Sequence, residues 1–315
     1  MPHLPRAGIR RWSAFLLSPY VGLATAAFLW SGNFVVGRAL RDTISPLALN
    51  FWRWTIALVV LLVFTHRPLW AHRRLILREW KLMAALGFTG IATFHTCVYL
   101  ALVTTSAVNA LLLLAMTPLL TMFGAWIVFR DPVTPAQIVG LSLSLLGAVL
   151  LIARGSLSSL MALHFGTGDL WMLLAVVLWS AYSLLLKRRP AELPQSVLLT
   201  TTTLIGVAWM LPVYAWVQSG EALPQLSAQA VWGLFYVAIF ASILAFLLWN
   251  DGVAKIGPNR ASTFIYLMPF FGALLSFAFL GEGVQPYQVT GGLLIFLGLG
   301  LMNWWRPRDA RSNSN

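Results

Sequence analysis

Long apolar segments alternate with short polar ones along the whole chain. No Asp, Glu, Lys or Arg occurs between Lys81 and Arg130, or between Leu193 and Gly220. A helix that crosses a bilayer needs about 20 predominantly apolar residues. The pattern therefore predicts an all-α integral membrane protein with ten transmembrane helices. The predicted spans are Tyr20–Leu40, Pro46–Thr65, Trp80–Val103, Ala107–Phe129, Pro135–Ala153, Asp169–Leu186, Val197–Val217, Ala228–Asn250, Ala261–Leu280 and Pro286–Trp305.

One block of the sequence occurs twice. Residues Asn109–Ile152 align with Arg260–Asn303 after a shift of 151 positions. The identical pairs include Ala110 and Ala261, Pro118 and Pro269, Pro135 and Pro286, Gln137 and Gln288, Gly140 and Gly291, and Gly147 and Gly298. Similarity at a fixed spacing indicates a duplicated architecture. We therefore predict two five-helix repeats, residues 1–155 and 165–306, followed by a tail of residues 307–315.

Composition supports a membrane protein, and the charges orient it. Hydrophobic residues make up 59% of the chain and charged residues only 10%, whereas a soluble protein has about 25% charged residues. With ten spans, seventeen of the 21 Lys and Arg residues fall on one side of the membrane, and only Arg38, Arg41 and Arg154 fall on the other. Basic loops stay in the cytoplasm, so both termini are predicted to be cytoplasmic.

The odd number of spans in each repeat has a mechanical consequence. After five crossings the chain is on the opposite side of the membrane, so the second repeat is inverted relative to the first. Inverted repeats are typical of alternating-access carriers, whose substrate site lies near the midplane between the halves. We therefore expect a multi-pass carrier with a small-molecule substrate, embedded in a lipid bilayer.

Several function classes do not fit the sequence. The net charge of +12 suggests nucleic acid, but the basic residues flank apolar runs and form no basic domain. Cys97 is the single cysteine, so neither an intramolecular disulfide nor a cysteine metal cluster is expected. There is no P-loop, so ATP is not the expected energy source. We expect no catalytic residues, no metal and no cofactor.

Several motifs resemble one known family. They are the segment Leu29-Trp30-Ser31-Gly32-Asn33-Phe34-Val35, the arginine Arg53 in the second span, and Met268-Pro269 followed by Gly281-Glu282, Pro286, Gln288 and Gly291. As a set they resemble the EamA-type ten-span branch of the drug/metabolite transporter superfamily, over nearly the whole chain. The first repeat departs from the pattern, with Arg130-Asp131-Pro132 where a Gly-Glu is expected.

The resemblance implies a secondary transporter in a bacterial inner (plasma) membrane that exports amino acids or related metabolites. The wider superfamily includes sugar-nucleotide and triose-phosphate exchangers, so export of a drug or another metabolite, or exchange of a phosphorylated sugar, is an alternative. From other classes, an integral-membrane transferase or a passive channel remains. A transferase needs paired carboxylates or a metal cluster, and a channel needs no inverted halves with matched prolines.

Polar groups inside a span are costly and mark candidate functional sites. Arg53 either anchors a substrate carboxylate or is locked to backbone carbonyls or to an acid such as Asp42. His95 and Tyr99 lie four residues apart on one helical face; the imidazole either contacts substrate or bonds a neighbouring helix. Whether a proton is exchanged stays open, with His95 as the candidate group.

Aromatic and polar residues in the first and sixth spans suggest a pocket for an apolar or aromatic solute. Trp30 and Asn33 lie in the first span, Trp179 and Tyr182 in the sixth, and Tyr266 in the ninth. The alternative for each is helix packing. The predicted substrate-binding residues are therefore Trp30, Asn33, Arg53, His95, Tyr99, Trp179, Tyr182 and Tyr266.

The matched prolines Pro118 and Pro269 are predicted hinges, because each removes a backbone hydrogen bond within a helix; the alternative is a static kink. Asp131 and Glu282 precede helix starts, where the helix dipole favours acids. Glycines in the fifth and tenth spans permit close helix contact. These helices either pack the halves together or build a dimer face, so monomer and homodimer both stay open.

Overall fold

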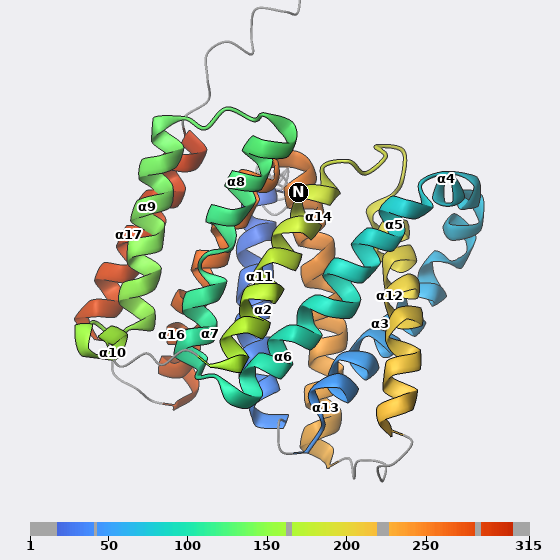
Figure 1. Ribbon diagram of the computed structural model, residues 1–315, viewed down its shortest axis with the longest axis horizontal. Helices are drawn as coiled ribbons and strands as arrows, with labels where there is room; N and C mark the ends of the chain where they lie inside the picture. Colours follow the sequence, from blue (N-terminus) through green and yellow to red (C-terminus); the bar gives the residue numbers. More distant parts are fainter. Residues whose placement is uncertain (1–17, 41–42, 162–165, 219–226, 281–284, 305–315) are drawn as a thin grey trace, which may run out of the picture.

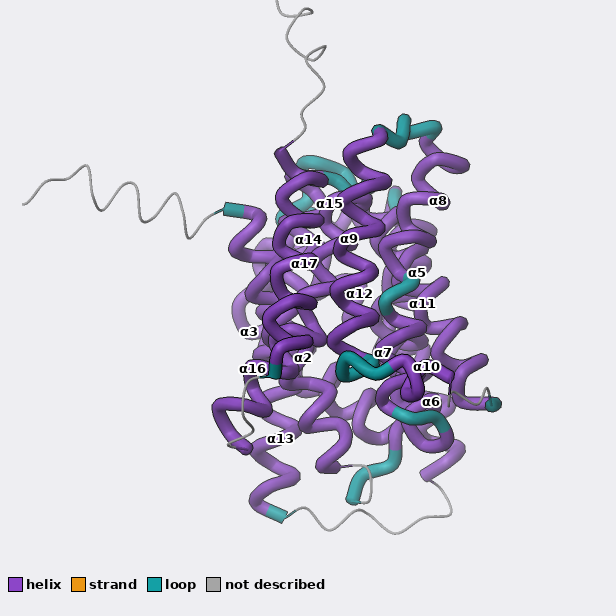
Figure 2. The backbone as a smooth tube through the Cα atoms, turned by 90° about the vertical axis from the view of Figure 1, so that its left-hand side faces the viewer, coloured by secondary structure: helices purple, strands orange, loops and turns teal. Residues whose placement is uncertain are grey.

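The computed structural model describes residues 18–40, 43–161, 166–218, 227–280 and 285–304. These residues form a bundle of roughly aligned helices and contain no β-strand (Figures 1 and 2). The helices of the first repeat are α2 (Pro19–Leu40), α3 (Pro46–Ala71), α4 (Arg73–Arg78), α5 (Trp80–Leu86), α6 (Phe94–Thr104), α7 (Ala107–Leu114), α8 (Thr117–Phe129), α9 (Pro135–Ile152) and α10 (Leu157–Met161). Those of the second are α11 (Thr167–Leu186), α12 (Gln195–Gln218), α13 (Ala228–Ala238), α14 (Ala245–Ile256), α15 (Pro258–Ser262), α16 (Leu267–Leu280) and α17 (Pro286–Trp304).

The predicted all-α membrane architecture is confirmed. Within the described residues, eight helical segments are long and apolar enough to cross a membrane, and they match the first eight predicted spans. The last two predicted spans are helical as well, over α15 to α16 and over α17. Ten membrane crossings therefore stay a prediction, whereas the duplicated helical bundle does not depend on that number.

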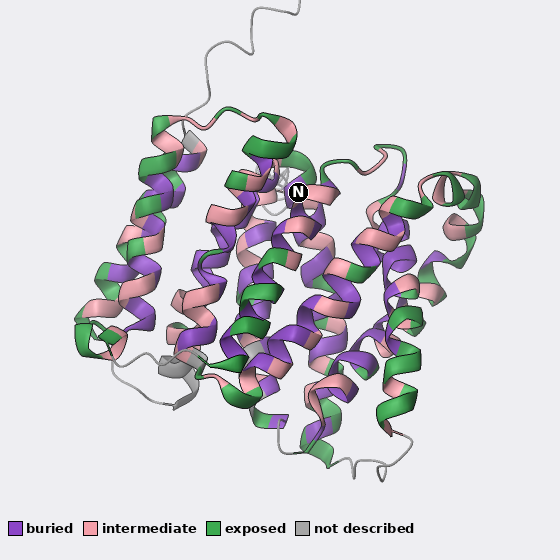
Figure 3. Ribbon diagram, viewed as in Figure 1, coloured by how far each residue is buried: buried purple, intermediate pink, exposed green. Residues whose placement is uncertain are grey.

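Apolar side chains cover the outside of the bundle. Phe64, Trp216 and Trp232 are more than two-thirds exposed, and in Figure 3 exposed positions recur on the outward faces of the helices while buried ones face inward. Exposed apolar area of this extent is unfavourable in water. A lipid environment removes that cost, because the hydrocarbon is as apolar as these side chains.

The most extensive contact between two described helices joins α9 and α17, the last spans of the two repeats. They lie side by side in both views (Figures 1 and 2). A methyl group built on Gly140 would collide with the carbonyl of Gly298, and one on Gly147 with that of Gly291. The helices are therefore antiparallel. Ser144, between the two glycines, donates its hydroxyl to the carbonyl of Ile295 at 3.3 Å.

These contacts reveal a two-fold relation between the repeats. The shift of 151 positions turns Gly140 into Gly291, Gly147 into Gly298 and Ser144 into Ile295. Ser144 therefore meets its own match, Ile295, while each glycine meets the match of the other glycine, with the helices in opposite directions. Such a contact is what two inverted repeats produce when their symmetry axis passes between the helices. The predicted role of these glycines in packing the halves together is consistent with this contact.

Two matched spans contain a π-helical turn, which the sequence analysis did not predict. The third span changes to π-helix over Gly87–Thr93 (η1), between α5 and α6, and the eighth does so over Ile239–Leu244 (η2), between α13 and α14. The segments coincide after a shift of 151 or 152 positions. Widened turns of this kind are frequent at functional sites.

The fourth and ninth spans are both interrupted just before their matched prolines. The fourth breaks at Ala115 and Met116, between α7 and α8, and Pro118 lies in the first turn of α8. The ninth tightens into a 3-10 helix over Thr263–Tyr266 (η3) shortly before Pro269. Regular α-helix is therefore interrupted beside the matched proline in both spans, and the role of Pro118 and Pro269 as hinges stays a prediction.

Asp131, which was predicted to stabilise the start of α9, forms an ion pair, and a different residue caps the helix. α9 is capped by Thr134, whose hydroxyl and backbone N–H form a capping box with Gln137. Asp131 instead forms an ion pair with Lys187, with Lys187 Nζ 2.6 Å from Asp131 Oδ2. This pair links the loop before α9 to the loop after α11. Glu282 and the candidate partner Asp42 lie outside the described residues.

Candidate functional site

A small cavity lies at the centre of the bundle, between helices of both repeats. About 20 Å³ of it is open to the centre of a water molecule, enough for roughly one or two waters. Its walls come from the first, third, fourth, sixth and ninth spans. The lining residues are Trp30, Asn33, Phe94, His95, Val98, Leu114, Trp179, Ile265 and Met268.

The predicted substrate residues fall into three groups around this cavity. Trp30, Asn33, His95 and Trp179 line it. Arg53 and Tyr99 do not line it, but both hydrogen-bond to Asn33. Tyr182 packs behind Trp179, and Tyr266 follows the lining residue Ile265 in the ninth span. The sequence therefore singled out residues that the fold brings into one region, and their contact with substrate stays a prediction.

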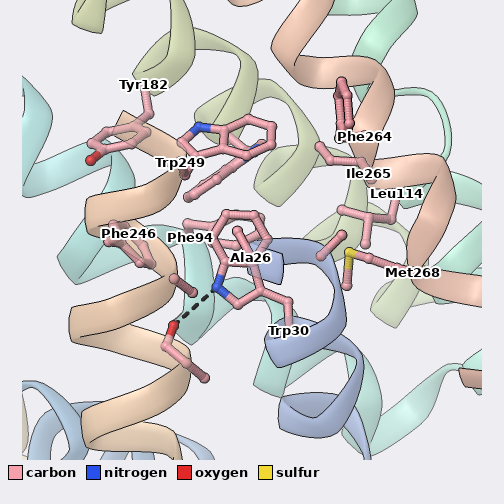
Figure 4. Close-up of a cluster of buried hydrophobic side chains, with 14 of the residues drawn as sticks. Ala26, Trp30, Phe94, Leu114, Tyr182, Phe246, Trp249, Phe264, Ile265 and Met268 are labelled. Atoms are coloured by element: carbon pink, nitrogen blue, oxygen red, sulfur yellow. Dashed lines mark hydrogen bonds between the residues drawn. The ribbon is translucent and has the colours of Figure 1, made fainter. Parts of the chain in front are cut away.

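Aromatic rings from both repeats form part of the cavity wall, and further rings pack behind them (Figure 4). Trp30 and Trp179, which occupy matched positions in the first and sixth spans, meet edge to face with ring centroids 5.1 Å apart. Trp249 lies 5.2 Å from Trp30, and Phe94 lies 4.7 Å from Trp179. Such edge-to-face and offset pairs stabilise each other beyond simple burial. The two repeats thus share one continuous aromatic wall.

The π-helical turn of the eighth span anchors this wall. The carbonyl of Ala241 in η2 accepts a hydrogen bond from the indole nitrogen of Trp30 at 3.0 Å, the dashed line in Figure 4. It also accepts one from Arg53 Nη2 at 3.3 Å. A π-turn shifts the helical hydrogen-bond register to i→i+5, which makes a carbonyl available to side chains from neighbouring helices.

Arg53 is fully buried, and neutral groups surround it. Its Nε donates to Ser242 Oγ at 2.8 Å, and its Nη1 donates to Tyr99 Oη at 2.9 Å and to Asn33 Oδ1 at 3.2 Å. Together with the bond to Ala241, these contacts hold the guanidinium in place. The expected locking to a backbone carbonyl is therefore present, as one of four contacts.

A carboxylate partner of Arg53 is missing among the described residues. The ion pairs found there join Arg78 to Glu79, Lys187 to Asp131 and Lys255 to Asp251, all at the surface. A buried charge without a counter-ion is destabilising by several kcal/mol unless hydrogen bonds compensate it. Four hydrogen bonds that Arg53 donates to neutral acceptors solvate this cation without neutralising it. The site therefore has the electrostatic character of an anion receptor.

His95 is 3% exposed and lies among aromatic rings. Its ring centroid is 4.7 Å from that of Phe94 and 6.2 Å from those of Trp54 and Tyr99. The predicted shared face of His95 and Tyr99 is thus present. The nitrogen Nδ1 is buried and has no hydrogen-bond partner among the described residues, so the imidazole has capacity for a further partner.

The remaining two tyrosines differ in their hydrogen bonds. Tyr182 stacks on Trp179, with centroids 5.2 Å apart, and donates its hydroxyl to Asn250 Oδ1 at 2.9 Å. Tyr266 is 1% exposed, and its hydroxyl has no partner in the described part of the chain.

At both hinge candidates, the carbonyl of the residue before the proline accepts a hydrogen bond from a serine. Ser31 donates its hydroxyl to the carbonyl of Met268, before Pro269, at 3.0 Å. Ser180 donates to the carbonyl of Thr117, before Pro118, at 3.4 Å. The two serines match in the repeat, and so do their acceptors.

Several residues of this region lie outside the predicted substrate-binding set: Ser31, Ser180, Asn250, Trp249, Phe246 and Phe94. The repeat in the sequence contained a signal for three of them. Extending the repeat alignment residue by residue pairs Ser31 with Ser180, and it also pairs Tyr99 with Asn250. No comparable signal indicated the carbonyl of Ala241 as an acceptor, because every residue has a backbone carbonyl and the sequence does not show which ones are free to accept.

Within the described ranges, no group of three or more His, Cys, Asp or Glu side chains is arranged to hold a metal ion. A buried cation, an imidazole with a vacant hydrogen-bonding position and an aromatic wall together suit a small solute with an acidic and an apolar part.

Comparisons with known proteins agree with this architecture. The chain is 28% identical over 284 residues to an uncharacterized transporter of Bacillus subtilis, YyaM, covering 90% of this chain and 92% of the relative. It is 25% identical over 281 residues to a probable terminal-alkyne amino-acid exporter of Streptantibioticus cattleyicolor, covering 89% and 92%. A solved crystal structure shares the fold, with a TM-score of 0.72 at 18% identity over 91% of this chain and 96% of the other.

The family model matches the chain twice, once in each half. The model of the EamA-like transporter family matches residues 17–153 and 166–304. The two matches leave out only the ends and the connection between the halves. The chain therefore belongs to the EamA-like transporter family of multi-pass membrane proteins.

Proposed function

We propose that this transporter exports amino acids or related small organic solutes by alternating access, in a bacterial inner membrane with both termini in the cytoplasm. The observation that carries the proposal is Arg53, a buried cation without a described counter-ion, beside a central cavity where the two repeats meet. An amino acid supplies the missing anion as its carboxylate. The basic loops support the orientation.

The chemistry of the site divides between two ends. Arg53 would bind the carboxylate through charge-assisted hydrogen bonds, which are about twice as strong as neutral ones. To do so, the carboxylate replaces Asn33 as the acceptor of Nη1. The apolar part of the solute then packs against the rings of Trp30 and Trp179. The vacant Nδ1 of His95 is the candidate for a further polar contact or for proton exchange.

The size of the cavity fits an occluded conformation. Ligand sites for small molecules are typically about 300–1,000 Å³, whereas the present cavity has room for roughly one or two waters. A solute enters only after helices separate. The interruptions before Pro118 and Pro269 are the proposed hinges of that movement, because they lie in matched spans that border the cavity.

A phosphorylated solute is the second candidate, because a guanidinium also binds phosphate in bidentate geometry. The nearly apolar lining favours an amino acid over this alternative, since a phosphorylated sugar has hydroxyl groups on all sides. One buried arginine also neutralises only one of the two charges of a phosphate dianion. Uptake assays with both solute classes separate the two.

The test is uptake into liposomes that contain the purified protein. Saturable uptake of a labelled amino acid by the wild type, reduced about 100-fold in Arg53→Gln, is the expected result, since a hydrogen-bonded ion pair contributes about 3 kcal/mol. Arg73→Gln is the matched control, because Arg73 is exposed and its described contacts are with the carbonyl and the ring of Trp70. Unsaturable uptake indicates a channel, and normal uptake by Arg53→Gln contradicts the anchor.

A further inference from the structure

Each repeat contains one hydrogen-bonded pair of a tyrosine and an asparagine. In the first repeat, Tyr99 of α6 donates its hydroxyl to Asn33 of α2 at 3.2 Å. In the second, Tyr182 of α11 donates to Asn250 of α14 at 2.9 Å. The shift that aligns the first and sixth spans, 149 positions, carries Asn33 onto Tyr182, and a shift of 151 carries Tyr99 onto Asn250. The same bond is therefore made twice, with donor and acceptor residues exchanged.

The two pairs lie on opposite sides of the central cavity. Asn33 is part of the cavity wall, whereas Tyr182 stacks behind the wall residue Trp179. The end of α6 contacts the start of α11 through the hydrogen bond from Thr105 to Asp169, so these helices run in opposite directions (Figure 1). Tyr99 and Tyr182 both lie in the later part of their helices and therefore toward opposite ends of the bundle.

Both pairs are sealed from solvent. Asn33 is 3% exposed, Tyr99 5%, and Tyr182 and Asn250 1% each. The rings fill their sites closely. A methyl group on Gly37 would lie 3.3 Å from the ring of Tyr99, and one on Gly90 would collide with the ring of Tyr182. Each pair thus ties two helices of its own repeat, the first to the third or the sixth to the eighth, and closes one side of the cavity.

We propose that these two pairs are the gates of the transporter. The Asn33–Tyr99 pair closes the path to the predicted external side, and the Tyr182–Asn250 pair closes the path to the predicted cytoplasmic side. The inference rests on the proposed alternating access. Both gates are closed in this structure, which accounts for a cavity with space for only a little water. Where the first repeat has asparagine the second has tyrosine, and the reverse, so both pairs form the same tyrosine-to-asparagine hydrogen bond.

The gates differ in how a ligand reaches them. Arg53 donates to both members of the first pair, Asn33 and Tyr99. A carboxylate that binds Arg53 competes for the same donors and loosens that gate. The second pair has a neutral neighbour, Gln195, whose Nε2 donates to the carbonyl of Asn250 at 3.3 Å. Ligand binding therefore acts directly on the first gate only.

The test measures access to the cavity from each side of the membrane. In a Cys97→Ser background, Leu114→Cys places a reporter thiol in the cavity wall, and a membrane-impermeant maleimide is applied to vesicles of either orientation. Tyr182→Phe should increase labelling from the predicted cytoplasmic side about fivefold, the factor expected for one lost buried hydrogen bond. Tyr99→Phe should increase labelling from the external side by a similar factor.

Two further variants keep the test decisive. Asn250→Leu breaks the second pair from its other member and should reproduce the sidedness of Tyr182→Phe even if that variant folds poorly. Tyr214→Phe is the matched control, because the described partner of the Tyr214 hydroxyl is Trp52, which donates to it, and neither residue lines the cavity. Labelling should stay at the background level. Increased labelling from the same side in both gate variants, or from neither side, overturns the proposal.

The labelling experiment needs no substrate, so the gate proposal and the transport proposal can be contradicted independently. Opposite sidedness without any amino-acid uptake supports the gates and contradicts the substrate class. Normal uptake without altered sidedness in the two tyrosine variants contradicts the gates and leaves the transport proposal standing.

Discussion

The two repeats share the arrangement of their helices, but they place different side chains beside the cavity. In both, a serine holds the carbonyl before a matched proline, and a π-turn widens a matched span. The first repeat adds Arg53 and His95. At the matched positions the second has the uncharged stretch Thr202 to Leu204 and the ring of Phe246.

This difference separates two tasks within one duplicated fold. The symmetric parts give the two halves equivalent ways to bend, so that two conformations open to opposite sides can have similar energies. The asymmetric parts give the cavity one charged end, so that a solute binds in one orientation. The frame therefore provides the movement, and the departures from symmetry provide the selectivity.

The largest expected effect comes from breaking the symmetric frame. Gly147→Leu forces a side chain against the carbonyl of Gly291 at the contact of α9 with α17. Overpacking of this kind costs about 3 kcal/mol, and we expect a large loss of thermal stability in detergent. Gly300→Leu is the control, because space is open around Gly300. Equal stability of the two variants contradicts the close contact.

A smaller effect should follow from making the first repeat resemble the second at the cavity. His95→Phe introduces the residue found at the matched position, Phe246, and preserves an aromatic neighbour for Phe94 and Trp54. We expect a folded protein with saturable uptake reduced about tenfold, the cost of one lost polar contact to the solute. Full uptake would remove His95 from the binding site, and loss of folding would make its role structural.

The prolines test the shared movement. Pro118→Ala and Pro269→Ala restore a donor to the backbone and make the fourth and ninth spans stiffer. Each should slow exchange about fivefold while solute binding is unchanged, since about 1 kcal/mol of added helix stability opposes bending. Stopped-flow uptake and equilibrium binding measure the two quantities. Wild-type exchange rates in both variants mean that the kinks are static.

The smallest effects are expected at the two serines. Ser31→Ala removes the 3.0 Å bond to Met268, and Ser180→Ala removes the 3.4 Å bond to Thr117. Both should lower stability by about 1 kcal/mol or less, with the larger change in Ser31→Ala because its bond is shorter. Thermal unfolding of the two purified variants gives the comparison. A larger loss in Ser180→Ala would reverse the expected order.

Much of this fold was predictable from the sequence, because the bilayer imposes simple rules. Long apolar runs predicted the first eight spans, and the repeated Pro118 and Pro269 marked the two spans in which regular α-helix is interrupted. The site was harder to predict. Residue types identified Arg53 and His95 as unusual, but one of the four acceptors of Arg53 is the carbonyl of Ala241 in a π-turn. Such a turn depends on packing between helices rather than on local residue preference, so the pattern of side chains did not predict it.

Exchange stimulated from the opposite side of the membrane tests the central claim most directly. Liposomes with the reconstituted transporter are loaded with an unlabelled amino acid, and entry of the labelled one is compared with entry into empty liposomes. Alternating access predicts faster entry into loaded liposomes, because the carrier returns with solute bound, and no stimulation by Arg53→Gln. Equal entry into loaded and empty liposomes would contradict the account.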